Sequence, residues 1–429
     1  MTTMDGVRSE QLATAHPWLG ELALRLLGAA LQILATLALV RVLSPEDAGI
    51  YFRGFVIALG LSALVRGKYE IYMAQQILGQ RSAESSVSNG VLLMQVARRM
   101  LVRSGLLCAV LLVLTADLDI QAPQLQAVLQ TYLPFVLALP CVSLSSLIGE
   151  VLRAANRTVG IVVSTYAVNV SILLTAWLAP PDAPLQLYSW AFLLGSMIAA
   201  AAATGLARYA FPVRRSEASL PISADVLNAV DARESIGLAR GAQLWGPLCI
   251  LAVMATPLEM AAYAVAARTA QIVDYFLPSL NLTGGRETLL AASSFETLES
   301  LPTARLVTAV LYSCALVAPL ILLAPVTLAI YGGPYSSQTV VYIVLLGVQW
   351  ANGVGRPAVR HAVAHWDLQR IGMTVGTGAL AAILVCALGI ARFGALAAAA
   401  GSLVGAAIIT GRAILITARG HDTANRAAA

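Results

Sequence analysis

The sequence has little charge and very little lysine. Charged residues make up 11% of its 429 positions, against about 25% in a soluble domain, and Lys68 is the single lysine. Hydrophobic residues account for 59% of the chain. A soluble enzyme, a disordered chain and a nucleic-acid-binding protein are all poorly compatible with this composition, and the scattered arginines form no cluster that would hold nucleic acid. The chain is therefore predicted to be a polytopic membrane protein.

Several motifs of enzyme and metal chemistry are also missing. No Walker sequence is present, so the chain is not expected to hydrolyse ATP by itself, and the five cysteines lie in apolar segments without short spacings. His361 and His365 have the spacing of a metal pair, but no third ligand accompanies them. We therefore expect no enzyme activity, no cofactor and no metal site.

Long apolar stretches dominate what is present. A spanning helix needs about 20 mostly apolar residues, and the first stretch, from about Leu19, is long enough to be such a helix. Arg41 follows it rather than a small-residue cleavage site, so a cleavable signal peptide is not expected. About twelve spans are predicted, at residues 19–43, 48–66, 101–117, 124–149, 158–179, 186–207, 234–255, 257–280, 303–331, 336–355, 369–390 and 394–414.

The connections between spans differ in their arginine content. Nearly all basic residues fall in residues 67–100, 150–157, 208–233, 281–302 and 356–368, together with the two termini. An excess of Lys and Arg marks cytoplasmic loops, so both termini are predicted to be cytoplasmic. The amphipathic residues 79–99 form either an interfacial helix or an inward extension of the third span.

A short motif recurs in the two halves of the chain. Residues Ser44–Tyr51 resemble Thr256–Tyr263 at an offset of 212 residues, and each half holds six predicted spans. Because an even number of spans returns the chain to the same side, the halves should form a parallel repeat with a cavity between them. We predict an all-α fold of two six-helix lobes, with an N-lobe at residues 1–208, a cytoplasmic linker at 209–233 and a C-lobe at 234–429.

Polar residues share one face of the first span. Glu21, Arg25, Gly28, Gln32 and Thr36 follow one another at steps of three or four residues, which is the spacing of one helical face. Ionisable groups inside a membrane are costly and commonly line a cavity. Arg25 and Gln32 are therefore candidate substrate-binding residues, and Glu21 is a candidate for ion coupling. A Glu21–Arg25 pair at the inner interface is the alternative interpretation.

Arg268 is the strongest single candidate. It lies near the middle of the eighth span, with Gln271 and Tyr275 on the same face. At that depth its side chain cannot extend to water, so we expect Arg268 and Gln271 to line a water-filled cavity.

Three further residues are weaker candidates. Arg53 lies inside the second span, where it would either line the cavity or extend to the outer surface. Arg240 forms an inner-half pair with Gln243 in the seventh span, which makes Arg240 a cavity candidate. Asp274, near an inner helix end, is either an ion-coupling residue or an interfacial one.

Three segments resemble polysaccharide flippases of the Wzx type. Residues Leu37–Ser62 look like the opening signature of that family, in which an apolar helix ends in a Leu-(Gly/Ser)-Pro-Glu turn followed by Gly-x-Tyr. Residues Ile330–Tyr335 resemble its Phe/Tyr-Gly-x-x-Tyr turn, and Leu152–Ile161 its short basic inner loop. The family is part of the multidrug/oligosaccharidyl-lipid/polysaccharide (MOP) exporter superfamily, which also contains MATE drug exporters and lipid II flippases.

The resemblance implies a two-lobed, V-shaped bundle in the bacterial inner membrane. Such a protein would move an undecaprenyl-pyrophosphate-linked oligosaccharide to the periplasmic leaflet for O-antigen, capsule or exopolysaccharide synthesis. Its partners would be this lipid-linked substrate and membrane lipids, with a polysaccharide polymerase and co-polymerase as further candidates. Related flippases carry cavity arginines in the first, second and eighth spans, where Arg25, Arg53 and Arg268 stand here.

Two other functional classes remain open. A cation-coupled, MATE-like drug exporter needs a membrane-embedded carboxylate that takes up and releases H⁺ or Na⁺, and no obvious carboxylate accompanies Arg268 at the midplane. A non-transporting scaffold for glycan assembly would not need the deep arginine or the repeat. The glycan and the coupling ion are not encoded in any of these patterns.

Overall fold

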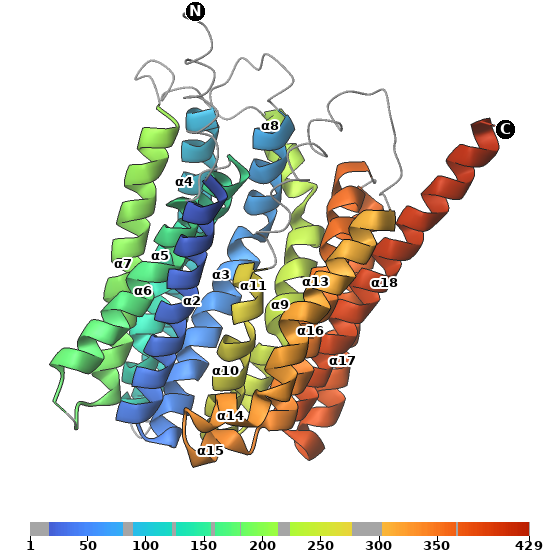
Figure 1. Ribbon diagram of the computed structural model, residues 1–429. Coiled ribbons are helices and arrows are strands. Elements are labelled where there is room, and N and C mark those ends of the chain that lie inside the picture. Colours follow the sequence, from blue (N-terminus) through green and yellow to red (C-terminus); the bar gives the residue numbers. More distant parts are fainter. Residues whose placement is uncertain are drawn as a thin grey trace, which may run out of the picture.

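The computed structural model describes the backbone of residues 17–79, 89–121, 126–155, 159–180, 182–212, 224–276, 303–365 and 368–428. These residues form a bundle of long helices, with no strand in the described part of the chain (Figure 1). The helices are α2 (Pro17–Val42), α3 (Pro45–Gly79), α4 (Asn89–Gln121), α5 (Gln126–Ala154), α6 (Val159–Leu178), α7 (Leu185–Ala210), α8 (Ala224–Asp231), α9 (Glu234–Met254), α10 (Pro257–Ala270), α11 (Ile272–Phe276), α13 (Thr303–Leu322), α14 (Ala324–Ala329), α15 (Gly333–Ser336), α16 (Thr339–His365), α17 (Leu368–Phe393) and α18 (Ala395–Ala428).

Each predicted span coincides with one of these helices or with a broken pair. Seven described helices are long and apolar enough to cross a membrane by length and composition, and three shorter apolar helices accompany them. The eighth span is divided into α10 and α11, and the ninth into α13 and α14. The protein is a multi-pass membrane protein with an all-α fold.

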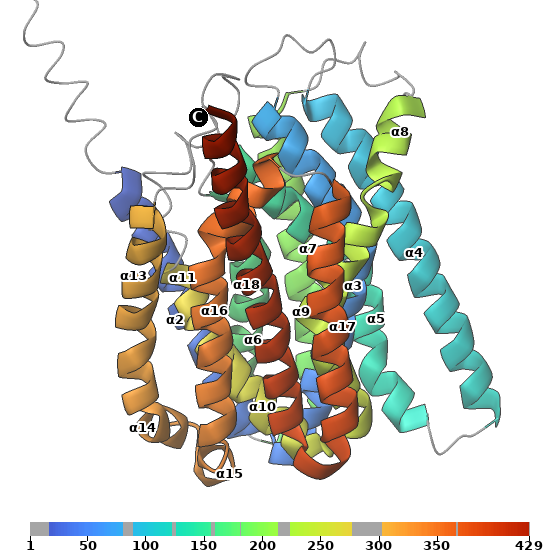
Figure 2. The same cartoon turned by 90° about the vertical axis from the view of Figure 1, so that its right-hand side faces the viewer.

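The two halves of the chain stand side by side as two six-helix lobes (Figure 1). Helix α2 begins and α18 ends at the end of the bundle that carries α8, and α14 and α15 lie at the opposite end (Figures 1 and 2). We call these the α8 end and the α15 end. The lobes meet along two seams: the α2 seam, where α2 packs against α10 and α11, and the α3 seam, where α3 packs against α9 and α10.

The repeated motif has a physical basis in helix capping. The backbone N–H of Glu259 donates to Thr256 Oγ1 at 3.3 Å, and that of Thr256 donates to Glu259 Oε2 at 2.9 Å. This is a capping box at the start of α10. At the start of α3, the N–H of Asp47 donates to Ser44 Oγ at 3.1 Å. Each half therefore starts its second long helix with the same local chemistry.

The predicted second span was too short at the α8 end, whereas the extension of the third span, one of the two interpretations of residues 79–99, is confirmed from Asn89 onward. Helix α3 continues past Arg66 to Gly79, and α4 begins at Asn89 as an extension of the third span. The extended parts of α3 and α4 bury Tyr72 and Leu92 in an apolar cluster at the α8 end. This cluster is separate from the main hydrophobic core, and we call it the second apolar cluster. This packing stabilises the parts of α3 and α4 that extend past the length that is needed to span a bilayer.

The stretch predicted as the linker is partly helical. Helix α8 lies within it, and Val230 is buried in the same second cluster. Residues 213–223 of the predicted linker are outside the described residues. The lobe boundaries at residues 208 and 234 stay predictions, as does the assignment of the α8 end to the cytoplasm.

Candidate functional site

Arg268 is buried near the centre of the bundle, with 7% of its surface exposed. Its Nη2 donates to Asn169 Oδ1 on α6 at 3.0 Å, and its guanidinium carbon lies 4.9 Å from the centroid of the Phe55 ring on α3. Its Nε and Nη1 are buried and have no hydrogen-bond partner among the described residues. A buried cation with unsatisfied donors is destabilising. The site therefore has capacity for an acceptor or an anion.

The chain is broken next to this arginine. Helix α10 ends at Ala270 and α11 starts at Ile272, so Gln271 forms a turn between them. Gln32 on α2 donates through Nε2 to the carbonyl of Arg268 at 2.9 Å and to Gln271 Oε1 at 3.2 Å. The Tyr275 hydroxyl donates to Gln32 Oε1 at 2.9 Å. The side chain of Gln32 thus joins the two lobes across the α2 seam.

Gly28 on α2 allows α6 and α11 to lie close to this helix. A Cβ atom at Gly28 would lie 2.7 Å from Tyr166 Cε1 and 3.2 Å from Tyr275 Cε1, so a larger residue would require both tyrosine rings to shift. Tyr166 also donates through its hydroxyl to the carbonyl of Leu24. Arg25 is buried and lies one helical turn from Gly28 on the same face of α2. The predicted polar face therefore points toward α10 and α11.

Thr36 and Glu21 are the two other predicted members of that face. Thr36 is buried and donates to the carbonyl of Gln32 at 2.7 Å, a bond within α2. Glu21 lies in α2, but its side chain is outside the described residues. Its role in ion coupling stays a prediction.

The remaining predicted site residues are dispersed. Arg53 is half-buried and donates through Nη2 to the carbonyl of Ala255, the C-cap of α9, toward the α15 end. Arg240 is exposed on α9 and Asp274 is half-buried on α11. Gln271 is exposed, although it accepts the hydrogen bond from Gln32. The structure thus brings together Gln32, Gln271 and Arg268, and leaves Arg53 and Arg240 elsewhere.

Sequence reasoning missed two residues that contact Arg268. Asn169 was not singled out as a site residue, although an amide in the middle of an apolar helix commonly bonds a neighbouring helix. It is 3% exposed and provides the hydrogen bond to the guanidinium. No sequence pattern singled out Phe55 as a site residue, because an aromatic residue does not stand out from the other residues of an apolar helix.

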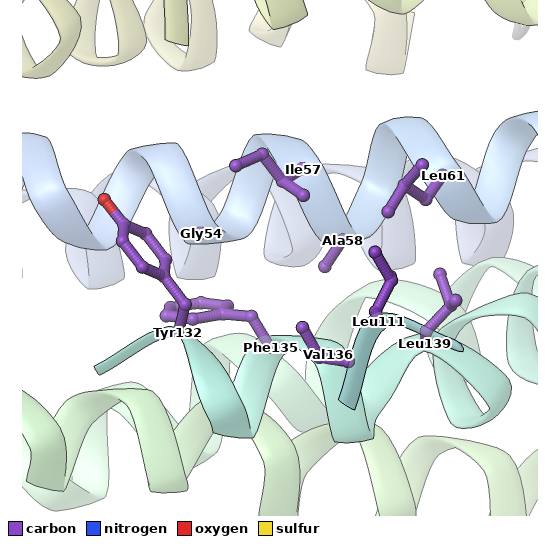
Figure 3. A pocket seen from close by; sticks show the side chains of 9 residues that line it. All are labelled: Gly54, Ile57, Ala58, Leu61, Leu111, Tyr132, Phe135, Val136 and Leu139. Atoms are coloured by element: carbon purple, nitrogen blue, oxygen red, sulfur yellow. The ribbon is translucent and has the colours of Figure 1, made fainter. Parts of the chain in front are cut away.

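An apolar pocket lies away from this site, between α3, α4 and α5 (Figure 3). Its walls include Leu61, Leu111 and Leu139, and the Tyr132 hydroxyl is the one polar atom among the labelled side chains. No charged group lines it. The pocket is therefore chemically unlike the surroundings of Arg268.

Comparison with known proteins identifies the fold. The sequence matches no protein-family model and no curated protein. An outward-facing multidrug resistance MATE family transporter of the MOP superfamily is similar over 95% of this chain and 96% of that chain, with a TM-score of 0.67 at 12% identity. The lipid II flippase MurJ in its inward closed conformation is similar over 94% of this chain and 87% of that chain, with a TM-score of 0.68 at 12% identity.

A MOP superfamily transporter from Pyrococcus furiosus is also similar, over 93% of each chain, with a TM-score of 0.57 at 12% identity. Together with the helical bundle, these likenesses show that the chain has the twelve-helix, two-lobed fold of MOP superfamily transporters.

Proposed function

We propose that the protein is a flippase that moves an undecaprenyl-pyrophosphate-linked oligosaccharide across the bacterial inner membrane by alternating access. The product would enter the synthesis of O-antigen, capsule or exopolysaccharide. The observation that carries this proposal is the buried guanidinium of Arg268, whose Nε and Nη1 have no partner among the described residues.

The chemistry of a diphosphate fits that guanidinium. Phosphate oxygens bind guanidinium groups through parallel N–H···O bonds, and these charge-assisted bonds are about twice as strong as neutral ones. Arg25 is buried on the opposing lobe, one turn from Gly28, where α2 meets Tyr275. In the proposed mechanism, the two arginines hold the anionic head group while the sugars occupy the space between the lobes.

The α2 seam is the part of the molecule that has to open for this substrate. Gln32 bonds Arg268, Gln271 and Tyr275 across it. Hydrogen bonds between uncharged groups contribute only about 1 kcal/mol each, so an arriving diphosphate can replace them. With the arginine-rich α8 end facing the cytoplasm, the substrate would enter from the side on which it is made.

A cation-coupled MATE-like drug exporter is the second candidate. The MATE transporter named above is about as similar in fold as the lipid II flippase. This mechanism would use a carboxylate, for which Glu21 and Asp274 are the predicted residues. Glu70 on α3 is a further buried carboxylate, and it pairs with Arg66 one turn away.

Deletion of the gene in the encoding bacterium separates the two functions. A flippase deletion should remove surface polysaccharide and accumulate lipid-linked oligosaccharide in the inner membrane, with unchanged drug susceptibility. Re-expression of the chain should reverse both effects. Normal surface polysaccharide together with increased drug susceptibility would establish the exporter instead. Binding to a polymerase or co-polymerase can be tested by co-purification from the same strain.

A further inference from the structure

The α3 seam is unusually tight at the α8 end, where glycines allow the two backbones to touch. A Cβ atom at Gly237 on α9 would lie 2.4 Å from the backbone nitrogen of Lys68, and one at Gly67 on α3 would lie 2.7 Å from the carbonyl oxygen of Gly237. One turn further along α9, a Cβ atom at Gly241 would lie 3.1 Å from Leu64 Cδ2. The backbones of α3 and α9 are therefore in direct contact at the α8 end of this seam.

Lys68 crosses this seam and pairs with two carboxylates. Its Nζ lies 2.6 Å from Asp231 Oδ1 at the end of α8 and 3.2 Å from Glu234 Oε2 at the start of α9. Glu234 Oε1 also accepts a bond of 3.0 Å from Arg103 Nη2 on α4. These ion pairs connect α3 and α4 of the N-lobe to α8 and α9.

Packing fixes the position of Asp231. Val226, Ala229 and Val230 on α8 contact or join the second apolar cluster, which contains Tyr72 of α3. The guanidinium carbon of Arg233 lies 5.5 Å from the centroid of the Tyr72 ring. Helix α8 is thus held against the N-lobe, and the carboxylate at its end is directed to Lys68.

The exposure of Asp231 and Glu234 allows the ion pairs with Lys68 to break and form again. The side chain of Lys68 is 6% exposed, whereas those of Asp231 and Glu234 are 63% and 40% exposed. Both carboxylates can be hydrated without further rearrangement if the seam opens, and the flexible lysine stem can carry its ammonium group to water. An apolar contact in the same place would have no such route to solvent.

We propose that Lys68, positioned by Asp231, forms with Glu234 a latch that closes the α8 end of the α3 seam and is released when the lobes separate there. Because α8 is packed against the N-lobe, opening this end separates Lys68 and Arg103 from Glu234 while Asp231 stays beside Lys68. The strength of the contact with Glu234 therefore determines how often this end is open. The inference rests on the alternating access of the proposed function. Its test measures opening without any substrate, so it can fail or succeed independently.

The test uses a reporter cysteine at a position that is buried in the α3 seam. Ala63 on α3 is buried beside Gly241, and Ala63→Cys is introduced after the five native cysteines have been replaced. The rate of maleimide alkylation in membranes then reports opening. We expect Lys68→Met to raise this rate about tenfold, since it removes the ammonium group that pairs with Glu234 across the seam and leaves the partly exposed carboxylate to water. Lys68→Arg should stay near the wild-type rate.

Two controls make the result specific. Arg208→Met removes a positive charge from the exposed end of α7 and should leave the rate unchanged. A second protein retains only Cys386, which is fully buried between helices of the C-lobe, and its alkylation should stay slow with and without Lys68→Met. Glu234→Gln removes the carboxylate charge that pairs with Lys68 across the seam, and it is the second test variant if Lys68→Met is absent from the membrane.

Faster alkylation of the reporter with Lys68→Met or Glu234→Gln, while Cys386 stays protected, supports the latch. An unchanged rate in the folded variants overturns it. Equal acceleration at the reporter and at Cys386 also overturns it, because the substitution would then loosen the whole bundle.

Discussion

Lys68 in the α3 seam and Arg268 at the α2 seam are both buried cations, and their surroundings are opposite. Lys68 in the α3 seam is paired with the carboxylates of Asp231 and Glu234. Arg268 at the α2 seam has an amide and an aromatic ring as partners, and no carboxylate among the described residues. A cation that is already neutralised can hold helices together, whereas one with neutral partners retains capacity for an anion. This difference is the one we expect between a contact that holds helices together and the anion-binding site proposed at Arg268.

The seams also differ in how their helices touch. Gly67 and Gly237 bring the backbones of the α3 seam into contact. In the α2 seam, the side chain of Gln32 spans the distance and bonds three groups of the other lobe. Side-chain hydrogen bonds can be exchanged for bonds to a ligand, and backbone packing cannot. We therefore expect a substrate to act on the α2 seam.

Removal of Arg268 should have the largest effect. Arg268→Ala is expected to lower surface-polysaccharide production in the complemented deletion strain by about 100-fold, the loss expected for charge-assisted bonds to an anion. Arg268→Lys should retain part of the activity, because lysine provides a charge without the planar fork. Membrane abundance, measured by immunoblotting, should stay normal. Full production with Arg268→Ala would show that the charge is structural.

The two cations should differ in their contribution to stability. Lys68→Met is expected to reduce stability by about 2 kcal/mol, a discounted value because the two carboxylates are partly exposed. Arg268→Met should leave stability unchanged or raise it, since it removes a buried charge that has no carboxylate partner. Thermal unfolding of the purified variants in one detergent tests this contrast. Equal losses in both variants would remove the distinction between the cations.

Asn169→Asp should make the surroundings of Arg268 like those of Lys68. The new carboxylate would pair with the guanidinium, so the substrate anion would have to displace it, and transport should fall about tenfold. The Tm should rise in the same variant. Asn169→Leu, which adds no charge, is the matched control and should reduce transport less. Undiminished transport with Asn169→Asp would contradict an anion site at Arg268.

Single hydrogen bonds across the α2 seam should have the smallest effect. Tyr275→Phe removes the bond to Gln32 and is expected to change the transport rate by about threefold, the size expected for one neutral bond. Tyr166→Phe removes a bond of the same kind within the N-lobe, to the carbonyl of Leu24. It should leave the rate close to that of the wild type. Equal effects of the two substitutions would mean that the seam bond has no special role.

Much of the fold could be predicted from local patterns. Each hydrophobic stretch predicted one span, and the repeated Ser/Thr-Pro-x-x motif predicted equivalent helix starts that the structure shows as caps at Ser44 and Thr256. A bilayer requires every spanning segment to satisfy its own backbone hydrogen bonds. Consequently, the local sequence is enough to define the helix.

The ends of helices outside the bilayer could not be predicted in the same way. Helix α3 continues to Gly79 because Tyr72 and Met73 pack against residues of α4 and α5. The break at Gln271 was also missed. Such features depend on what packs beside the chain, and hydropathy does not record that.

For the candidate site, the sequence by itself predicted that Arg268 lies near the middle of a spanning segment and that Arg25 and Gln32 share one face of α2. It did not distinguish Arg268 from Lys68 by their partners. Asn169 is 99 residues from Arg268 along the chain, and Asp231 is 163 residues from Lys68. Only the tertiary structure decided which cation is neutralised, because the contacts between helices depend on packing across the whole bundle and no local pattern specifies them.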